Sequence, residues 1–205
     1  MKQENRAQVS VHLEGPVVSV HPNDKGSPVG LRIMTGDFEN AKDGVIPDMC
    51  VHEVLLFGVK DKTSFVEKYK PKTFVSLDGS LGRDKMGQQF VRSDEKRLQV
   101  VDKLGKDNNT VVAKGYITRI ISKNGQSAID IGGLCVTLGR KENDAYNQIV
   151  ENNPTDGIRF EATGKLVTRK YSDGQNAFRM IYVKANSIRE LARRKTVKTQ
   201  VSQVK

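Results

Sequence analysis

A short basic and aromatic run near residue 170 combines the residue types that hold a polyanionic strand. Arg169, Lys170 and Tyr171 are consecutive, and the polar turn residues 172–174 follow them. Cations pair with phosphates, and a ring beside a turn, where there is little core to fill, offers a flat face on which a base can stack. We therefore interpret Tyr171 as a base platform, with local packing of the turn as the alternative.

Other cations and rings along the chain could extend this surface. Phe178 begins the segment after the turn, where burial and contact with nucleic acid are equally open, and Phe90 is interpreted as its counterpart in the first half of the chain. The candidate nucleic-acid-binding residues are Arg169, Lys170, Tyr171, Phe178, Arg179, Lys184, Lys165, Phe90 and Arg83. Phe160 alternates with Ile158 and Ala162, which predicts that its side chain lies in the core. Phe57, Phe74 and Tyr146 are likewise predicted to be core residues.

The charge is unevenly distributed along the 205 residues. The chain has 34 Lys and Arg against 24 Asp and Glu, a formal net charge of +10. Residues 1–104 hold 16 basic and 15 acidic side chains, whereas residues 105–205 hold 18 and 9, so nearly all the excess lies in the second half. Such a concentration indicates a polyanion partner, with a solvated basic face as the alternative. No basic amphipathic helix with large apolar anchors supports a membrane surface as that partner.

The sequence offers little for catalysis, metals or cofactors. The three histidines, His12, His21 and His52, have no carboxylate partner at an informative spacing, and no P-loop, HExxH or GxSxG motif occurs. Cys50 and Cys135 are expected to be reduced thiols, since two cysteines form no disulfide framework and no histidine pair completes a zinc site. We expect a non-enzymatic protein with no catalytic residue, metal or cofactor.

Membrane and export signals are not evident either. No apolar run reaches the ~18–20 residues that span a bilayer, and the first residues lack the apolar core of a signal peptide. The expected location is the cytoplasm.

Period-two alternation dominates the chain and predicts β-structure. In the first half the predicted strands are 9–20, interrupted at Gly15-Pro16, then 29–33, 51–57, 73–81 and 89–101, with one helix over 61–69. In the second half the predicted strands are 111–121, 127–131, 134–138, 158–167 and 178–183, with a helix over 141–151.

Both halves follow one plan of three strands, a short helix and two strands. LLFG at 55–58 matches VTLG at 136–139, and TFVSLDGSL at 73–81 matches IRFEATGKL at 158–166. Units of about 90 residues are too long for a solenoid repeat and suit a small barrel. This element order is that of the OB-fold. The predicted fold class is all-β with short helices, as two tandem OB-fold five-stranded barrels.

The predicted domain boundaries follow from this plan. They are an N-terminal arm 1–8, a first OB-fold 9–102, a polar linker 103–109, a second, basic OB-fold 110–191 and a basic C-terminal tail 192–205. The tail is interpreted either as a source of further phosphate contacts or as a solvated end.

The second half resembles the fourth and fifth strands of the bacterial single-stranded DNA-binding protein family. The stretch 157–183 contains the motif positions Gly164, Leu166, Thr168, Arg169, Lys170, Tyr171, Asp173, Gly174 and Gln175. In the first half, VHEVLLFG at 51–58 is similar to the family's third strand. The resemblance implies a protein that coats and protects single-stranded DNA during replication, recombination or repair.

The chain also departs from that family. Val51 stands where the family's third strand usually opens with a tryptophan, and the chain has no tryptophan. Residues 82–86 replace the Thr-Arg-Lys-aromatic element in the first half, so we expect the second half to grip the strand while the first scaffolds, pairs with a partner or binds weakly. The basic end at 192–205 differs from the acidic tip by which family members recruit replication proteins. The basic end disfavours a housekeeping bacterial member and favours a phage or mobile-element type, or a primosomal protein of the same fold, located at the nucleoid or, if viral, in the host cytoplasm.

The partners expected from the resemblance are single-stranded DNA, with RNA left open, and replication proteins reached without an acidic tip. Family members typically assemble four OB-folds, so the resemblance implies a homodimer of a chain that has two. The alternative function is an OB-fold module that binds protein or RNA, such as a primosomal accessory protein, because OB-folds host all of these activities.

Overall fold

The computed structural model describes residues 7–23, 28–85, 87–123, 126–152, 159–172 and 177–191. At 121–123, 126–127, 149–152, 171–172 and 177–178 it describes the backbone alone. The predicted tail 192–205 and most of the predicted arm therefore lie outside the described residues.

The first half of the chain forms a closed ring of five strands, which we call the first ring. Its elements are β1 (Gln8–His21), β2 (Val29–Thr35), β3 (Cys50–Phe57), α1 (Lys62–Lys68), β4 (Phe74–Arg83), β5 (Gln89–Asp94), η1 (Glu95–Arg97) and β6 (Leu98–Val100). Pairing runs β1–β2–β3–β5–β4 and returns from β4 to β1, with β3 and β5 parallel. The short β6 adds to β4.

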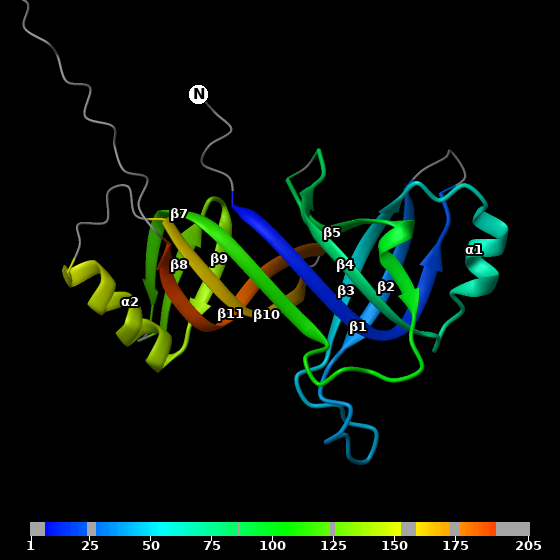
Figure 1. Cartoon of the computed structure of the whole chain (residues 1–205), viewed down its shortest axis with the longest axis horizontal. Coiled ribbons are helices and arrows are strands. Elements are labelled where there is room, and N and C mark those ends of the chain that lie inside the picture. Colours follow the sequence, from blue (N-terminus) through cyan, green and yellow to red (C-terminus); the bar gives the residue numbers. More distant parts are fainter. Residues whose placement is uncertain are drawn as a thin grey trace, which may run out of the picture.

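The second half closes in the same order, forming the second ring. Its elements are β7 (Asn109–Lys123), β8 (Gln126–Ile131), β9 (Leu134–Leu138), α2 (Arg140–Asn152), β10 (Arg159–Ser172) and β11 (Ala177–Leu191). Pairing runs β7–β8–β9–β11–β10 and returns to β7, and β9 and β11 are parallel. The predictions of an all-β class and of an OB-fold are confirmed; α1 and α2 lie at opposite ends of the molecule (Figure 1).

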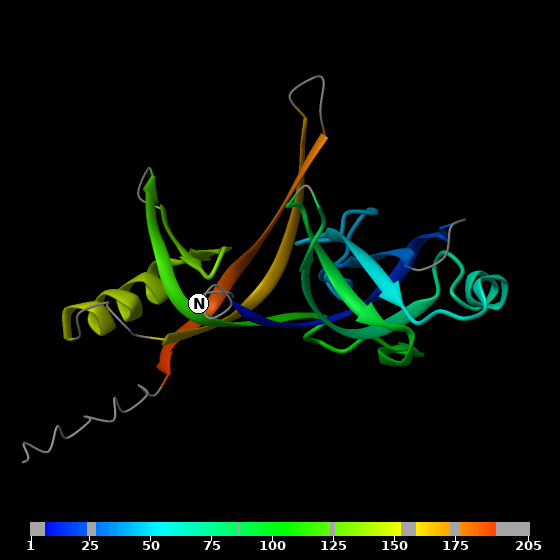
Figure 2. The ribbon, with the colours of Figure 1, turned by 90° about the horizontal axis from the view of Figure 1, so that it is seen from above.

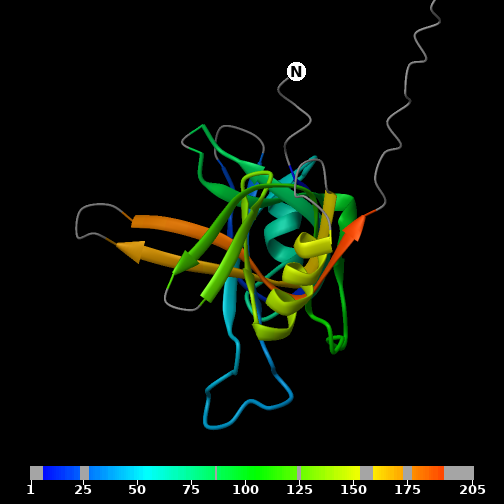
Figure 3. The same ribbon diagram turned by 90° about the vertical axis from the view of Figure 1, so that its left-hand side faces the viewer.

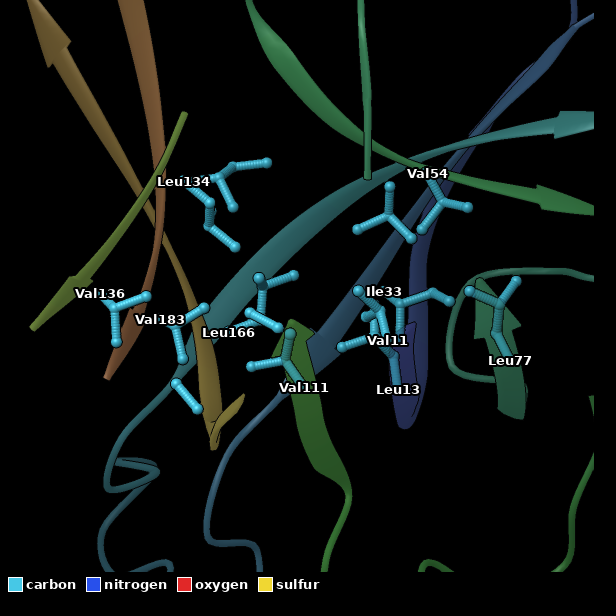
Figure 4. Packing of buried hydrophobic residues seen from close by; sticks show 14 of the residues in the cluster. Val11, Leu13, Ile33, Val54, Leu77, Val111, Leu134, Val136, Leu166 and Val183 are labelled. Carbon is cyan, nitrogen blue, oxygen red and sulfur yellow. The ribbon is translucent and has the colours of Figure 1, made fainter. Parts of the chain in front are cut away.

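Alternating apolar side chains fill the interior of each ring. On β2, for example, Val29, Leu31 and Ile33 are buried, while Arg32 between them is half-buried on the outer face. Figure 4 shows buried side chains of both rings near their junction, among them Val11, Leu13, Ile33, Val54, Leu77, Val111, Leu134, Val136, Leu166 and Val183. Burial of this apolar surface is the main term that holds the strands in register.

Two of the four aromatic side chains that were predicted to be buried lie in the core. Phe160 and Tyr146 are buried, with centroids 5.9 Å apart. The prediction is wrong for Phe74, which is 41% exposed, and for Phe57, which is half-buried on the outer face. Val75 points into the core at the start of β4, and successive side chains of a strand point to opposite faces, so Phe74 points out.

Two strand predictions also differ from the structure. β1 continues through Gly15-Pro16 without the predicted break, and its pairing passes from β4 and β7 to β2 at a bulge between Val17 and Ser19. Bulges bend a strand and increase its twist, which lets one strand serve two partners. Residues 89–101 are not one strand, because η1 separates β5 from β6.

The two rings join edge to edge through their first strands. β1 and β7 pair antiparallel, with Val11 opposite Val111, and both side chains are buried. On the other edge of each strand, Val11 lies opposite Gly79 of β4 and Val111 lies opposite Gly164 of β10. Gly79 and Gly164 hold the same place in the repeats 73–81 and 158–166. Each ring thus presents equivalent positions to the other, as in an isologous two-fold interface.

Candidate nucleic-acid interface

The hairpin of β10 and β11 leaves the second ring and extends between the two rings (Figure 2). The two strands pair from Arg159↔Leu191 to Ser172↔Ala177, whereas the pairing of β4 and β5 in the first ring ends at Arg83↔Gln89. Viewed from the side, the hairpin and the segment between β2 and β3 leave the body in different directions (Figure 3). OB-folds bind oligonucleotides on strands two and three and on the adjoining loops, so this hairpin belongs to the expected binding region.

A buried histidine ties the hairpin to the first ring. His52 Nε2 lies 2.9 Å from Thr35 Oγ1, and His52 Nδ1 lies 3.1 Å from Thr168 Oγ1 on β10. Asn109 Nδ2 donates to Thr35 Oγ1 at 3.2 Å and to the Leu166 carbonyl at 2.8 Å, and Asn109 Oδ1 accepts from the Leu166 N–H at 2.9 Å. Burial lowers the pKa of His52 to about 4, so the ring is neutral at neutral pH. A neutral imidazole offers one donor and one acceptor, which suits two hydroxyl partners.

Beside this network, one carboxylate gathers three cations from both rings. Glu53 on β3 lies 2.6 Å from Arg179, 3.1 Å from Arg32 and 3.8 Å from Lys170, measured between carboxylate oxygens and side-chain nitrogens. Arg32 is the cross-strand partner of Glu53 on β2, and Lys170 and Arg179 face each other across the β10–β11 hairpin. Two of the predicted binding cations are therefore held on the first ring.

The shorter β4–β5 hairpin contacts the second ring in turn. The Arg83 guanidinium at the end of β4 donates to the carbonyl of Gly133, in the turn between β8 and β9. In each ring the hairpin that joins strands four and five therefore contacts the other ring: the β10–β11 hairpin contacts β3, and the β4–β5 hairpin contacts the turn between β8 and β9. The binding regions of two OB-folds are brought to one place by this exchange.

Two adjoining hollows lie at this exchange, and we call them together the inter-ring groove. The larger, of ≈ 790 Å³, is lined by residues that include Arg83, Asp84, Lys85, Phe90, Arg92 and Leu134. The smaller, of ≈ 270 Å³, shares Arg83 with it and also contains Asp130, Arg179 and Met180. Cations thus outnumber acids in the lining. The Asp130 carboxylate already has hydrogen-bond partners beside it, because it accepts from the Thr118 hydroxyl and from the Gly133 N–H, each at 2.6 Å.

Two aromatic side chains of the first ring lie near these cations. Phe90 on β5 is half-buried in the larger hollow, and Gly82 opposite leaves the room its ring needs: a Cβ there would come within 2.7 Å of the Phe90 ring. The Arg92 guanidinium lies 4.5 Å from the centroid of the Phe57 ring, a cation–π distance. Arg32, Arg92 and Phe57 were not among the predicted site residues, although strand parity already places all three on outer faces.

The structure brings some predicted residues together and separates others. Arg83, Phe90 and Arg179 line the groove. Lys165 and Lys184 pair across β10 and β11 further from the turn, and Lys165 lies 3.2 Å from Asp48 beside a different hollow of ≈ 300 Å³.

The remaining predicted residues lie toward the tip of the β10–β11 hairpin. Arg169 is exposed, with its guanidinium 5.8 Å from the centroid of the Tyr182 ring. Tyr171 and Phe178 are opposite each other in the register of the hairpin. Their side chains and the turn 173–176 lie outside the described part of the chain.

The register corrects one sequence correspondence. The matching leucines of the two repeats, Leu81 and Leu166, pair with valines that directly follow Phe90 and Tyr182. The counterpart of Phe90 is therefore Tyr182, and the predicted match with Phe178 is wrong. The hairpin of the second ring is longer by several residue pairs. An alignment based on the loop motifs therefore assigns the wrong aromatic residue as the counterpart of Phe90.

His12 has two carboxylate partners, contrary to the sequence-based expectation. Its Nδ1 lies 2.8 Å from Asp78 and its Nε2 3.2 Å from Glu14. Partial burial lowers the pKa of His12, but these two carboxylates together outweigh it and raise the pKa above its usual value. Among the described residues, no cluster of three or more His, Cys, Asp or Glu side chains is arranged to hold a metal ion. Neither described helix is long and apolar enough to cross a membrane.

Comparison with known proteins finds matches among solved structures. No protein-family model and no curated protein sequence matches it. The wild-type single-stranded DNA binding protein from Thermus aquaticus has a TM-score of 0.62 at 15% identity, over 92% of this chain and 95% of that chain. A deletion variant of the single-stranded DNA binding protein from that organism gives 0.60 at 15% identity, over 94% and 98%. Both chains are covered almost in full, so the shared fold includes both rings.

Proposed function

We propose that this protein binds single-stranded DNA without sequence specificity, along the inter-ring groove and the β10–β11 hairpin. The observation that carries the proposal is the convergence of Arg83, Arg179 and Phe90 on one groove, where the hairpin of each ring meets the other ring. Non-specific binding of single strands uses a basic channel that follows the backbone and aromatic faces on which bases stack. OB-folds bind oligonucleotides in this same region.

Two further observations support the proposal. The excess of basic residues lies in the second half, which carries the long hairpin with Arg169 and Lys170 exposed. The two solved structures described above, which share the fold, are named as single-stranded DNA binding proteins.

We also propose the finer role inferred from the sequence. The protein would coat and protect single strands during replication, recombination or repair, as a phage or mobile-element type, without catalysis. It would act in the cytoplasm as a homodimer that assembles four OB-folds. The first ring would do more than scaffold, since it supplies Arg83 and Phe90 to the groove.

Binding is expected to favour single strands and to depend steeply on salt. Fluorescence anisotropy of oligo(dT), a duplex of equal length and an RNA of equal length, from about 50 to 300 mM salt, gives affinities and slopes. Three or more phosphate contacts predict a slope of about −2 or steeper in log K against log salt, at about −0.7 per contact. A slope near zero, or a preference for duplex, would contradict the proposal, and equal or tighter binding of RNA would favour the RNA-binding alternative.

Replacing Tyr171 by alanine is expected to weaken oligo(dT) binding about 5- to 150-fold, the loss of one stacked base at about 1–3 kcal/mol. Tyr171→Phe is the matched control and should bind almost normally, because stacking needs the ring and not the hydroxyl. The same anisotropy titration measures both variants. If Tyr171→Ala lowers the melting temperature and leaves the affinity unchanged, Tyr171 packs within the hairpin instead.

A further inference from the structure

The three cations around Glu53 are arranged as they would be around a bound phosphate, with the Glu53 carboxylate in the place of the phosphate. Two guanidinium groups and one ammonium, from Arg179, Arg32 and Lys170, converge on its two carboxylate oxygens at 2.6, 3.1 and 3.8 Å. Arginine and lysine pair with carboxylate and phosphate by the same charge-assisted hydrogen bonds. Three positive charges on one negative charge leave the cluster with a surplus that one carboxylate does not neutralise.

The donors of this cluster also exceed its acceptors. The Arg179 side chain is only 20% exposed, and its Nε is a buried donor with no acceptor among the described residues. A buried donor without an acceptor is unfavourable, and such groups in native structures call for an explanation. A strand phosphodiester carries one negative charge on two oxygens, as the carboxylate does, but it is not attached to β3 and can take a position from which it also accepts from the Arg179 Nε.

The cluster lies where a strand would pass from one ring to the other. Arg179 lines the smaller hollow of the inter-ring groove. Arg32 and Glu53 line another hollow, of ≈ 460 Å³, on the outer face of β2 and β3 in the first ring. This face of strands two and three is a binding face of OB-folds, so the cluster connects the groove with that face.

We infer that Arg32, Lys170 and Arg179 form a phosphate subsite shared by the two rings, and that Glu53 occupies it in the free protein. A phosphate of a bound strand displaces Glu53 and takes over its three cations. Glu53 is thus an internal competitor that weakens binding and lowers its salt dependence. The identity of the ligand as a nucleic-acid strand rests on the proposed function; the phosphate chemistry of the subsite does not.

Glu53→Gln in the full chain is the direct test, because it removes the competing charge and keeps the shape of the side chain. We expect about fivefold to tenfold tighter binding of oligo(dT) at low salt, and a slope steeper by about 0.7 for each cation released to a phosphate. Glu161→Gln is the matched control. Glu161 also holds two cations, at 2.9 Å from Lys114 and 2.5 Å from Arg189, but it lines none of these hollows. An equal gain in that control would reduce the effect to net charge and overturn the subsite.

A double-mutant cycle tests whether the gain arises from these cations. Arg32→Ala should change the affinity of the parent protein little, because Glu53 already holds that arginine, and should remove most of the gain in the Glu53→Gln background. Additive effects of the two substitutions would overturn the subsite.

Inorganic phosphate separates failure of the subsite from failure of the proposed function. Thermal denaturation in a phosphate titration should show stabilisation of the Glu53→Gln protein and little effect on the parent chain. If phosphate stabilises the variant but no chain binds oligo(dT), the subsite stands and the proposed function fails. If oligo(dT) binds all chains alike and phosphate stabilises none of them, the proposed function stands and the subsite is overturned.

Discussion

Gly164→Ala is expected to be among the most destabilising single substitutions in this chain. A Cβ at Gly164 would lie 2.1 Å from the Lys184 carbonyl oxygen and 2.8 Å from the Ala185 Cα, both backbone atoms of β11. Backbone cannot turn aside as a flexible side chain can, so β10 and β11 must separate beside the bulge at residues 163/164. We expect a loss of about 3 kcal/mol or more, and a fall in the melting temperature of roughly 6–12 °C for a chain of this size.

Gly30→Ala is the matched control for that substitution. A Cβ at Gly30, also within a strand, would lie 3.4 Å from the nearest atoms of His21, at the edge of ordinary contact. Its melting temperature should stay within about 2 °C of the parent. Equal melting temperatures for the parent and Gly164→Ala in calorimetry would contradict the close approach of β10 to β11.

The second large effect is a loss of stability as pH falls, caused by His52. Burial lowers its pKa to about 4, from 6.5 in the unfolded chain. The unfolded state therefore binds a proton in the window between these values and the folded state does not, so stability is retained above 6.5 and lost as pH falls toward 4. The whole window represents about 3 kcal/mol, and about 2 kcal/mol is expected between pH 8 and pH 5.

Urea unfolding across that range, with His52→Gln as the comparison, measures the effect. The variant lacks the titrating ring, so this pH dependence should be absent even if its stability at pH 8 is lower. His12 contributes with the opposite sign. Its pKa is raised by Asp78 and Glu14, so its contribution is present below 6.5 and is lost as pH rises through the folded value. An unchanged pH dependence in His52→Gln would contradict the assignment of the effect to His52.

The alternation of inward and outward side chains along each strand accounts for most of the correct sequence-based predictions. The same alternation would also have corrected two wrong ones. The alternation of buried and outward residues identified the principal strands and the order of the two rings. Applied strictly, it also assigns Phe74 and Phe57 to outer faces, because Val75 and Leu56 next to them point inward. The prediction placed them in the core by analogy with Phe160, without applying the alternation to their own strands, and many apolar side chains of folded proteins lie at the surface.

The contacts between the two rings could not be predicted from the sequence, for a different reason. His52 and Thr168 are separated by 116 positions and by the closure of both rings. No local sequence pattern links one of these residues to the other. The same is true of Glu53 and Arg179. The cations of the hairpin were predicted from composition, but the acid that holds them could be found only once the direction of the hairpin was known.

The pairing of Val11 with Val111 has a consequence for how the two halves can change. In an interface between two identical chains, one codon supplies both sides, so every substitution appears twice and must suit both. Here the two sides are encoded separately, and one half can vary while the other keeps its partner. A long basic hairpin on one ring and a short, nearly neutral partner on the other require this freedom. Linkage within one gene thus allows a nearly symmetric junction to carry two unequal rings.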